Sequence, residues 1–259
     1  MGPRKPIDLE PTVMVESLHV GFAGREVLHN LSAEFRRGQL AVILGHSGSG
    51  KTTFLRAFNR LNECFPRSET SGSFRLKLQG EWRDIYQNEM PLPELRRRVG
   101  MVFQTPHLLP GSIADNLALP VKLVLGLPRR DIPSRVEWAL EEAHLWEEVK
   151  DRLEAPAHTL SGGQQQRLCL ARLLALDPKI LLLDEPTASL DFRASLKVEE
   201  LLLSLKERYT IIAVSHSLSQ ARRLADEALI FRDSSVVQRL SREDLKAPDT
   251  LQALLEEIF

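Results

Sequence analysis

The sequence lacks a strong excess of charge of either sign. Its 34 lysines and arginines stand against 35 aspartates and glutamates, which leaves a formal net charge of −1 over 259 residues. Domains dedicated to nucleic acids usually carry a marked positive excess that neutralises phosphates. We therefore expect no nucleic-acid partner for this chain.

Cysteines and long apolar runs are also scarce. The two cysteines, Cys64 and Cys169, stand far apart, so neither a disulfide framework nor a zinc site is indicated. No run approaches the roughly 18 consecutive apolar residues that a membrane span needs. The first residues lack the apolar stretch of a secretory signal. We expect a chain that stays in the cytosol.

The rest of the composition, 43% hydrophobic and 27% charged, is that of an ordinary globular protein. Short β-like runs alternate with helical runs, which is typical of an α/β fold with a mainly parallel sheet. The period-two alternation at residues 73–78 instead favours an antiparallel, half-solvated sheet, which residues 13–20 would share. Parallel strands are expected at residues 40–44, 179–184 and 209–214, and helices at residues 51–61 and 193–205.

The middle of the chain, about residues 106–159, is poor in strand signals. One amphipathic run within it has apolar residues at Val136, Ala139, Leu140 and Ala143. Because this is the spacing of a helix with one apolar face, we interpret the segment as a helical lobe inserted into the α/β core. A final helix is expected over residues 251–258, where four apolar residues follow the same spacing.

A glycine-rich loop follows the strand at residues 40–44. Two glycines separated by four residues precede a lysine and a threonine, and such a loop lets backbone N–H groups close around phosphates at the positive end of a helix. Lys51 would reach the β- and γ-phosphates, and the Thr52 hydroxyl would bind Mg²⁺. The alternative is a flexible glycine–serine turn that precedes a lysine by chance. The expected phosphate-binding residues are Gly45, His46, Ser47, Gly48, Ser49, Gly50, Lys51, Thr52 and Thr53.

Two carboxylates, Asp184 and Glu185, follow directly on the apolar run at residues 180–183. Ligands of open α/β sheets lie at the carboxyl ends of the strands, where these side chains would stand. Asp184 is suited to hold Mg²⁺, and Glu185 to polarise the water that attacks a γ-phosphate. The alternative is a pair of solvated acids that end a strand.

Leu160-Ser161-Gly162-Gly163-Gln164 precedes a second amphipathic helix, at residues 165–176. With this motif the sequence resembles the nucleotide-binding subunits of ATP-binding-cassette (ABC) transporters. The resemblance implies a P-loop NTPase core (about residues 1–105 and 160–259) that includes an antiparallel β subdomain, with a helical subdomain at about residues 106–159. The alternative is a glycine-rich helix cap without a ligand.

The resemblance also implies roles for individual residues. In this family two subunits pack head to tail around ATP and Mg²⁺, so the turn Ser161, Gly162, Gly163 and Gln164 would meet the partner's nucleotide. Gln104 matches the glutamine that contacts Mg²⁺ and water, and His216 matches the histidine on the γ-phosphate. Asp191 matches the aspartate that crosses the interface, and Phe22 the aromatic residue that stacks on adenine.

Within the family, the chain most resembles the phosphate-importer group. The similarity rests on residues 56–62 and 65–66, on residues 135–140 and 145–151, and on residues 164–169. Departures include His46 where proline is usual, and Phe192 where proline commonly follows the aspartate. The resemblance implies a homodimer bound to integral-membrane permeases at the cytoplasmic face of the membrane, and indirectly served by a solute-binding protein.

Other functions stay open at this point. Another cargo, such as a phosphonate, a different oxyanion or an amino acid, would leave the same ATPase motifs, because this subunit never touches the cargo. A chromosome-type ATPase would need a long coiled coil between the glycine-rich loop and the Ser161 turn, yet no sustained heptads occur there. A regulator without turnover would be expected to lose Glu185 or His216.

Overall fold

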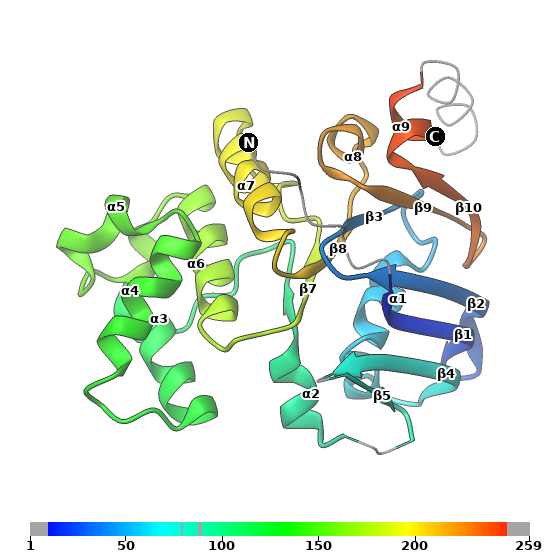
Figure 1. Ribbon diagram of the computed structural model, residues 1–259, viewed down its shortest axis with the longest axis horizontal. Coiled ribbons are helices and arrows are strands. Elements are labelled where there is room, and N and C mark those ends of the chain that lie inside the picture. Colours follow the sequence, from blue (N-terminus) through cyan, green and yellow to red (C-terminus); the bar gives the residue numbers. More distant parts are fainter. Residues whose placement is uncertain (1–9, 79, 88–89, 248–259) are drawn as a thin grey trace.

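The computed structural model describes residues 10–78, 80–87 and 90–247 and shows two sheets with helices around them (Figure 1). One sheet is antiparallel and has the strand order β2-β1-β4-β5. Its strands are β1 (Pro11–Phe22), β2 (Arg25–Arg36), β4 (Ser68–Leu78) and β5 (Glu81–Asp84). The antiparallel sheet expected from residues 13–20 and 73–78 is thus present.

The second sheet has the order β10-β9-β3-β8-β7-β6, in which β10 alone runs antiparallel to its neighbour. The central strands β3, β7 and β8 are buried over their whole length, as parallel strands covered on both faces must be. The six strands are β3 (Leu40–Leu44), β6 (Val99–Val102), β7 (Ile180–Asp184), β8 (Thr210–Val214), β9 (Glu227–Arg232) and β10 (Ser235–Ser241).

Helices gather into a lobe at one end of the core sheet, on the left of Figure 1, and no strand occurs in residues 106–159. The lobe contains α3 (Ile113–Pro120), the π-helical turn η2 (Val121–Leu125), α4 (Ile132–Glu142), α5 (Trp146–Val149) and the start of α6 (Gly162–Leu174). The remaining helices are α1 (Lys51–Ala57), α2 (Leu92–Arg98), α7 (Phe192–Leu205), α8 (Leu218–Leu224) and α9 (Arg242–Lys246). Single turns of 3₁₀-helix are η1 (Leu61–Cys64), η3 (Lys150–Arg152) and η4 (Ala157–Thr159).

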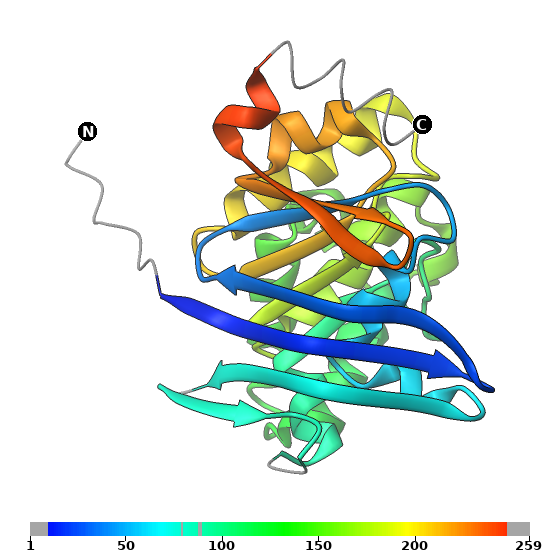
Figure 2. The same ribbon diagram turned by 90° about the vertical axis from the view of Figure 1, so that its right-hand side faces the viewer.

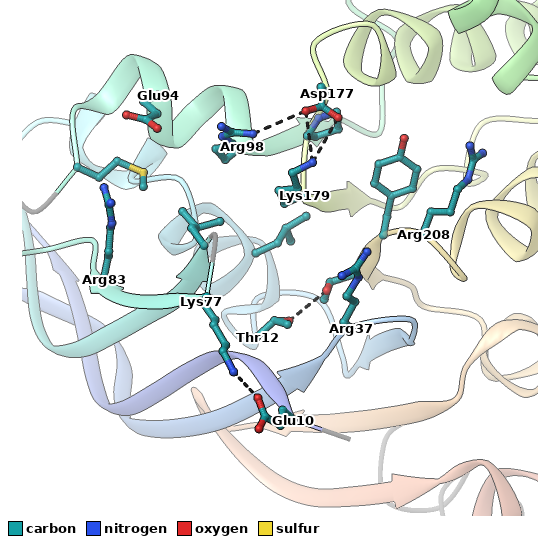
Figure 3. Close-up of a pocket in the computed structure, with 17 residues that line it drawn as sticks. Glu10, Thr12, Arg37, Lys77, Arg83, Glu94, Arg98, Asp177, Lys179 and Arg208 are labelled. Atoms are coloured by element: carbon teal, nitrogen blue, oxygen red, sulfur yellow. Dashed lines mark hydrogen bonds and ion pairs between the residues drawn. The ribbon is translucent and has the colours of Figure 1, made fainter. Parts of the chain in front are cut away.

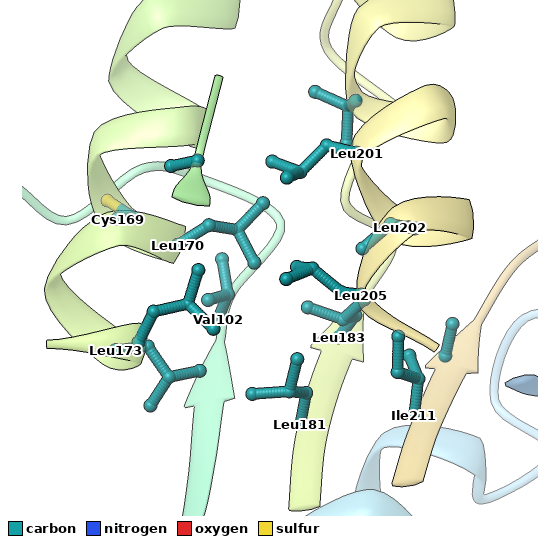
Figure 4. Close-up of a cluster of buried hydrophobic side chains, with 14 of the residues drawn as sticks. Val102, Cys169, Leu170, Leu173, Leu181, Leu183, Leu201, Leu202, Leu205 and Ile211 are labelled. Atoms are coloured by element: carbon teal, nitrogen blue, oxygen red, sulfur yellow. The ribbon is translucent and has the colours of Figure 1, made fainter. Parts of the chain in front are cut away.

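The core sheet divides the apolar interior into two clusters. Along β7, Leu181 and Leu183 face α6 and α7 (Figure 4), whereas Ile180 and Leu182 belong to the cluster that includes the antiparallel sheet. Seen from the side, the antiparallel strands form a layer of their own (Figure 2). Each fully buried leucine contributes roughly 1.5–3 kcal/mol. The sheet is thereby fixed from both faces, and its strand ends have defined positions.

Two helix expectations have different outcomes. The helix predicted over residues 51–61 ends at Ala57, so its last turn is wrong. Arg60 has a left-handed backbone (φ +56°), and its guanidinium donates to the Ile85 carbonyl (2.9 Å) and to Glu63, so tertiary contacts replace the last helical turn. The helix expected over residues 251–258 lies outside the described residues.

Candidate functional site

The glycine-rich loop between β3 and α1 is seated tightly against the core. Gly45, Gly48 and Gly50 all have positive φ angles (+154°, +82° and +94°), which L side chains rarely adopt. A Cβ at Gly45 would lie 2.3 Å from the Phe231 carbonyl oxygen, so β9 leaves room for glycine alone. The loop backbone is therefore held in one shape by its neighbours.

Lys51 folds back over this loop. Its ammonium group donates to the carbonyls of Gly45 (2.8 Å) and His46 (2.7 Å), and the side chain is buried. Burial lowers the pKa of Lys51, while the charges of Glu185 and Asp184 oppose the shift. A buried ammonium group that is bonded to neutral carbonyls favours an anion beside it.

The two predicted carboxylates stand at the carboxyl end of β7. The Thr52 hydroxyl donates to Asp184 Oδ1 at 3.0 Å, which joins the start of α1 to this strand end. Burial raises the pKa of Asp184, and the Thr52 hydrogen bond with the charges of Arg56, Lys51 and His216 opposes that rise. A hydroxyl and a carboxylate so placed form the oxygen-donor set that Mg²⁺ prefers.

Glu185 lies beside His216, whose Nε2 is 2.6 Å from Glu185 Oε1. The glutamate has a left-handed backbone (φ +48°), which costs a residue with a side chain about 1–2 kcal/mol. Its amide donates to the Val214 carbonyl at 3.1 Å, so β8 holds it in this conformation. Strain of this kind at a strand end is typical of functional positions.

These groups surround one pocket of about 350 Å³. Its lining residues are Val27, Ser47, Gly48, Gly50, Lys51, Thr52, Thr53, Glu185 and His216. Of these, Val27 was not predicted, because a valine in a strand normally belongs to the core and only the fold of β2 turns it toward the loop. The buried Ser49 hydroxyl has no hydrogen-bond partner among the described residues, which suits a loop that closes around a polar ligand.

Several predicted residues do not line the pocket, namely Gly45, His46, Ser49, Asp184, Phe22 and Gln104. Phe22 ends β1 and makes an edge-to-face contact with Phe65, with ring centroids 5.9 Å apart. Gln104 is exposed just after β6. The adenine and water contacts of these residues remain predictions.

The predicted Ser161 turn begins α6 on a different part of the surface. Ser161 is the N-cap, and its hydroxyl accepts from the Gln164 amide while Gln164 Oε1 accepts from the Ser161 amide, which is a capping box. Ser161 and Gly162 are exposed, and no residue of this turn lines the 350 Å³ pocket. Within one chain the two predicted phosphate-binding turns therefore remain separate.

The start of α7 packs beside this turn. A Cβ at Gly163 would lie 2.7 Å from the Ala194 Cβ, so glycine allows the two helices to approach. Asp191 is exposed and caps α7 by accepting from the Ala194 amide at 2.9 Å. The exposed Ser161 turn and Asp191 thus share one face.

Glu148 supports the Ser161 turn, although no individual role was predicted for it from the sequence. It accepts from Gln164 (2.8 Å), from Arg167 (2.9 Å) and from Lys197 (2.8 Å), which come from α6 and α7. Although burial alone would raise the pKa of Glu148, these three hydrogen bonds lower it to about 2. The carboxylate therefore ties α5, α6 and α7 together.

Comparison with known proteins identifies the family. A family model described as ABC transporter matches residues 28–188. The chain belongs to the ABC transporter family. The ABC-type ATPase and the α/β fold expected from its sequence are thereby confirmed. Among the described residues, no helix is both long and apolar enough to cross a membrane.

Several relatives resemble the chain over most of its length. It is 39% identical to "Phosphate import ATP-binding protein PstB 2" of Lactobacillus acidophilus over 237 residues, which covers 92% of this chain and 93% of that protein. It is 42% identical to "PstB 3" of a Synechocystis species, over 92% and 86% of the two chains. The solved structure of cbiO1 from Clostridium perfringens, part of the ABC transporter complex cbiONQ, superposes with a TM-score of 0.80 at 26% identity over 95% of each chain.

Proposed function

We propose that this chain is the ATP-hydrolysing subunit of an importer of inorganic phosphate. The 350 Å³ pocket, where the glycine-rich loop, Lys51 and Glu185 meet, carries the ATPase part of the proposal. The phosphate part rests on the relatives named for phosphate import, at 39–42% identity over about nine tenths of this chain.

The pocket residues would bind the triphosphate of ATP from one side. Loop amides between Gly45 and Gly50, with the buried Lys51 ammonium, supply donors for the β- and γ-phosphates. Thr52, Asp184 and Gln104 are the residues that would hold Mg²⁺. When bound, Mg²⁺ would neutralise charge on the phosphate oxygens.

Glu185 is the general base of the proposed reaction. Its carboxylate would accept a proton from the water that attacks the γ-phosphate, which leaves ADP and inorganic phosphate as products. His216, 2.6 Å from Glu185, would hold the carboxylate and contact the γ-phosphate. Phe22 would stack on the adenine ring.

A second copy would complete the site. At the start of the 13-residue helix α6, the Gly162 and Gly163 amides make no hydrogen bond within the described part of the chain, and the Ser161 turn lies away from the pocket of its own chain. In a head-to-tail homodimer this turn and Asp191 would cover the partner's nucleotide. Hydrolysis would remove the γ-phosphate that joins the two copies, and the dimer would reopen.

The helical lobe offers a surface for a permease. An apolar groove of about 240 Å³ lies between β6, the segment at residues 103–109 and α6, and its lining includes Phe103, Leu109 and Leu173. Leu119, Leu123 and Val124 are exposed on the same lobe. We propose that integral-membrane permeases bind here, which would hold the chain at the cytoplasmic face of the membrane, and that a solute-binding protein delivers the phosphate to them.

The Glu185→Gln variant tests the ATPase cycle. It should bind Mg·ATP, lose about 10²–10⁴-fold in turnover, and elute as a dimer in size-exclusion chromatography. Glu200→Gln, a matched change at an exposed position of α7, should behave as wild type. Phosphate release at the wild-type rate, or a monomer in Mg·ATP, would contradict the proposed role of Glu185.

Radiolabelled uptake tests the cargo separately. Cells that lack the gene for this chain should lose high-affinity phosphate uptake. The wild-type gene should restore the uptake, whereas the Glu185→Gln gene should not. Normal phosphate uptake combined with loss of phosphonate or amino-acid uptake would replace the proposed cargo and leave the ATPase cycle intact.

A further inference from the structure

The central strands β7 and β8 have polar groups near both of their ends. At their first residues lies a cavity of about 600 Å³ (Figure 3), where Asp177 forms ion pairs with Arg98 (3.7 Å) and Lys179 (3.3 Å). Near their last residues, on the side of the nucleotide pocket, the polar side chains of Ser215 and Gln220 are buried. Because buried polar groups need hydrogen-bond partners, the positions of these two side chains are set by the groups around them.

Gln220, on α8, is the centre of a buried polar network. Its amide oxygen accepts from the Ser215 hydroxyl at 2.8 Å. Its amide nitrogen donates to the Thr187 hydroxyl at 2.7 Å and to Glu199 Oε1 at 3.1 Å. Since Thr187 follows β7, Ser215 follows β8 and Glu199 lies on α7, one side chain joins two strand ends and two helices.

Glu199 sets the orientation of the Gln220 amide. Both Glu199 oxygens accept from the Arg223 guanidinium, at 2.7 and 2.8 Å, and a carboxylate paired in this way offers acceptors alone. The amide nitrogen of Gln220 must therefore face Glu199, and its oxygen must face Ser215. Turning the amide by half a rotation would place two oxygen atoms against each other.

Ser215 connects Gln220 to the turn that carries His216. The Ser215 hydroxyl has one proton, which it donates to Gln220, and it accepts from the Ser217 amide at 3.0 Å. This second bond closes a short serine turn with His216 at its centre. The Ser215 amide donates to the Ile43 carbonyl of β3 at 3.1 Å, so the turn starts from a fixed strand end.

Thr187 connects Gln220 to the turn that carries Glu185. The Ala188 amide donates to the Glu185 carbonyl at 3.2 Å, so Glu185 and Thr187 belong to one turn. The Glu185 carboxylate in turn lies 2.6 Å from His216 Nε2. The two turns whose side chains meet at the nucleotide pocket are thus joined a second time, through the Gln220 amide.

We propose that Gln220 is a positioning residue for ATP hydrolysis, which fixes Glu185 and His216 relative to each other by joining the turns that carry them. The inference rests on the proposed function, because Gln220 would act through these two residues. A misplacement of about 1 Å at a reacting centre can lower a rate roughly 100-fold. Since Gln220 does not line the pocket, its loss should affect turnover more than nucleotide binding.

Steady-state kinetics of the full chain with Mg·ATP test the proposal. Gln220→Met keeps the length of the side chain and removes its amide, so kcat should fall about 10- to 100-fold while KM stays within about twofold. Asn116→Leu is the matched control, because it removes another buried amide, with hydrogen bonds to Leu109 and Ser112, and it should keep kcat. An unchanged kcat in Gln220→Met, or an equal loss in Asn116→Leu, would overturn the proposal.

Two smaller changes keep the test open if Gln220→Met does not fold. Thr187→Val and Ser215→Ala each remove one hydroxyl from the network, and each should lower kcat with little change in KM. Breaking either bond already disconnects the two turns, so the double variant should lose no more than the more damaging single change. Wild-type kcat in both single variants, or additive losses in the double variant, would count against Gln220 as the joint.

A measurement that needs no turnover separates this inference from the proposed function. With ¹⁵N-labelled histidine, the His216 ring signals, assigned through His216→Gln, should shift in Gln220→Met and stay in place in Asn116→Leu. Unmoved His216 signals would overturn the inference. Shifted signals in a chain whose wild type releases no phosphate from ATP would contradict the proposed function and still support the joint between the two turns.

Discussion

The two glycine turns predicted to contact ATP, one before α1 and one before α6, differ in what surrounds them. The loop before α1 borders a pocket of its own chain, with Lys51 buried over it and Glu185 opposite. The turn before α6 is capped by Ser161 and Gln164 and is otherwise exposed. The first turn thus has its chemical partners within the chain, whereas the second has only structural ones.

The difference explains why one sequence carries both turns. A helix start with free amides can bind an anion wherever the anion arrives. The loop before α1 would bind the nucleotide phosphates directly from solvent. The turn before α6 would contact the phosphates of a nucleotide that is already bound to a second copy. Changes at the two turns should therefore separate binding from turnover.

The largest difference between the effect on turnover and the effect on nucleotide binding is expected for Ser161→Arg. The bulky cation would block the partner's site, so turnover should fall about 100-fold or more, which is the usual effect of losing an aligned donor. Nucleotide affinity measured on the monomer should stay within twofold of wild type. The matched control is Ser241→Arg, which removes the similar capping box of α9 and should keep its turnover. An equal loss in both variants would mean that the cap alone matters.

Lys51→Ala should instead weaken nucleotide binding itself. Losing the buried ammonium group removes charge-assisted hydrogen bonds worth about 1.5–3 kcal/mol, so nucleotide affinity should fall roughly 10- to 100-fold. Titration calorimetry with Mg·ADP measures this loss directly, and Lys122→Ala, at an exposed lysine, serves as control. Unchanged affinity would remove Lys51 from the proposed site.

The smallest effect is expected for a change at Glu148, which supports the turn before α6. Its folded pKa of about 2 lies below its ordinary value of 4.5, so the ion pairs stabilise the fold above about pH 4.5, and this contribution is lost as the pH falls toward 2. Since the side chain is partly exposed, Glu148→Gln should cost roughly 1–2 kcal/mol in the free energy of unfolding at neutral pH.

Urea unfolding at several pH values measures the Glu148 contribution. Glu147→Gln is the matched control, because its pair with Lys150 is exposed and should contribute less than the contacts of Glu148. A Glu148→Gln variant that differs from wild type by the same amount at pH 7 and pH 2.5 would refute the ion-pair account.

Strand runs and loop motifs could be predicted from the sequence because they depend on local pattern. The apolar run at residues 180–183 and the acids after it predict both a buried strand and the place of its carboxylates. The separation of the Ser161 turn from the glycine-rich loop was also expected, although through family resemblance. The two turns belong to different helices, and only the fold sets their distance.

Other features depend on contacts that a sequence pattern does not contain. Helix α1 stops at Ala57 because Arg60 bonds across to Ile85, which is distant in sequence. Val27 reaches the pocket through the path of β2, and Glu148 gains its role from Lys197 on another helix.

The close approach at Gly163 has a consequence for motion. A Cβ at Gly163 would lie only 2.7 Å from the Ala194 Cβ, so the starts of α6 and α7 are in close contact. This contact should keep the two helix starts from sliding past one another. The serine turn and Asp191 should then move as one body in the proposed dimer cycle. A neighbouring subunit would lose both contacts in a single step rather than one after the other.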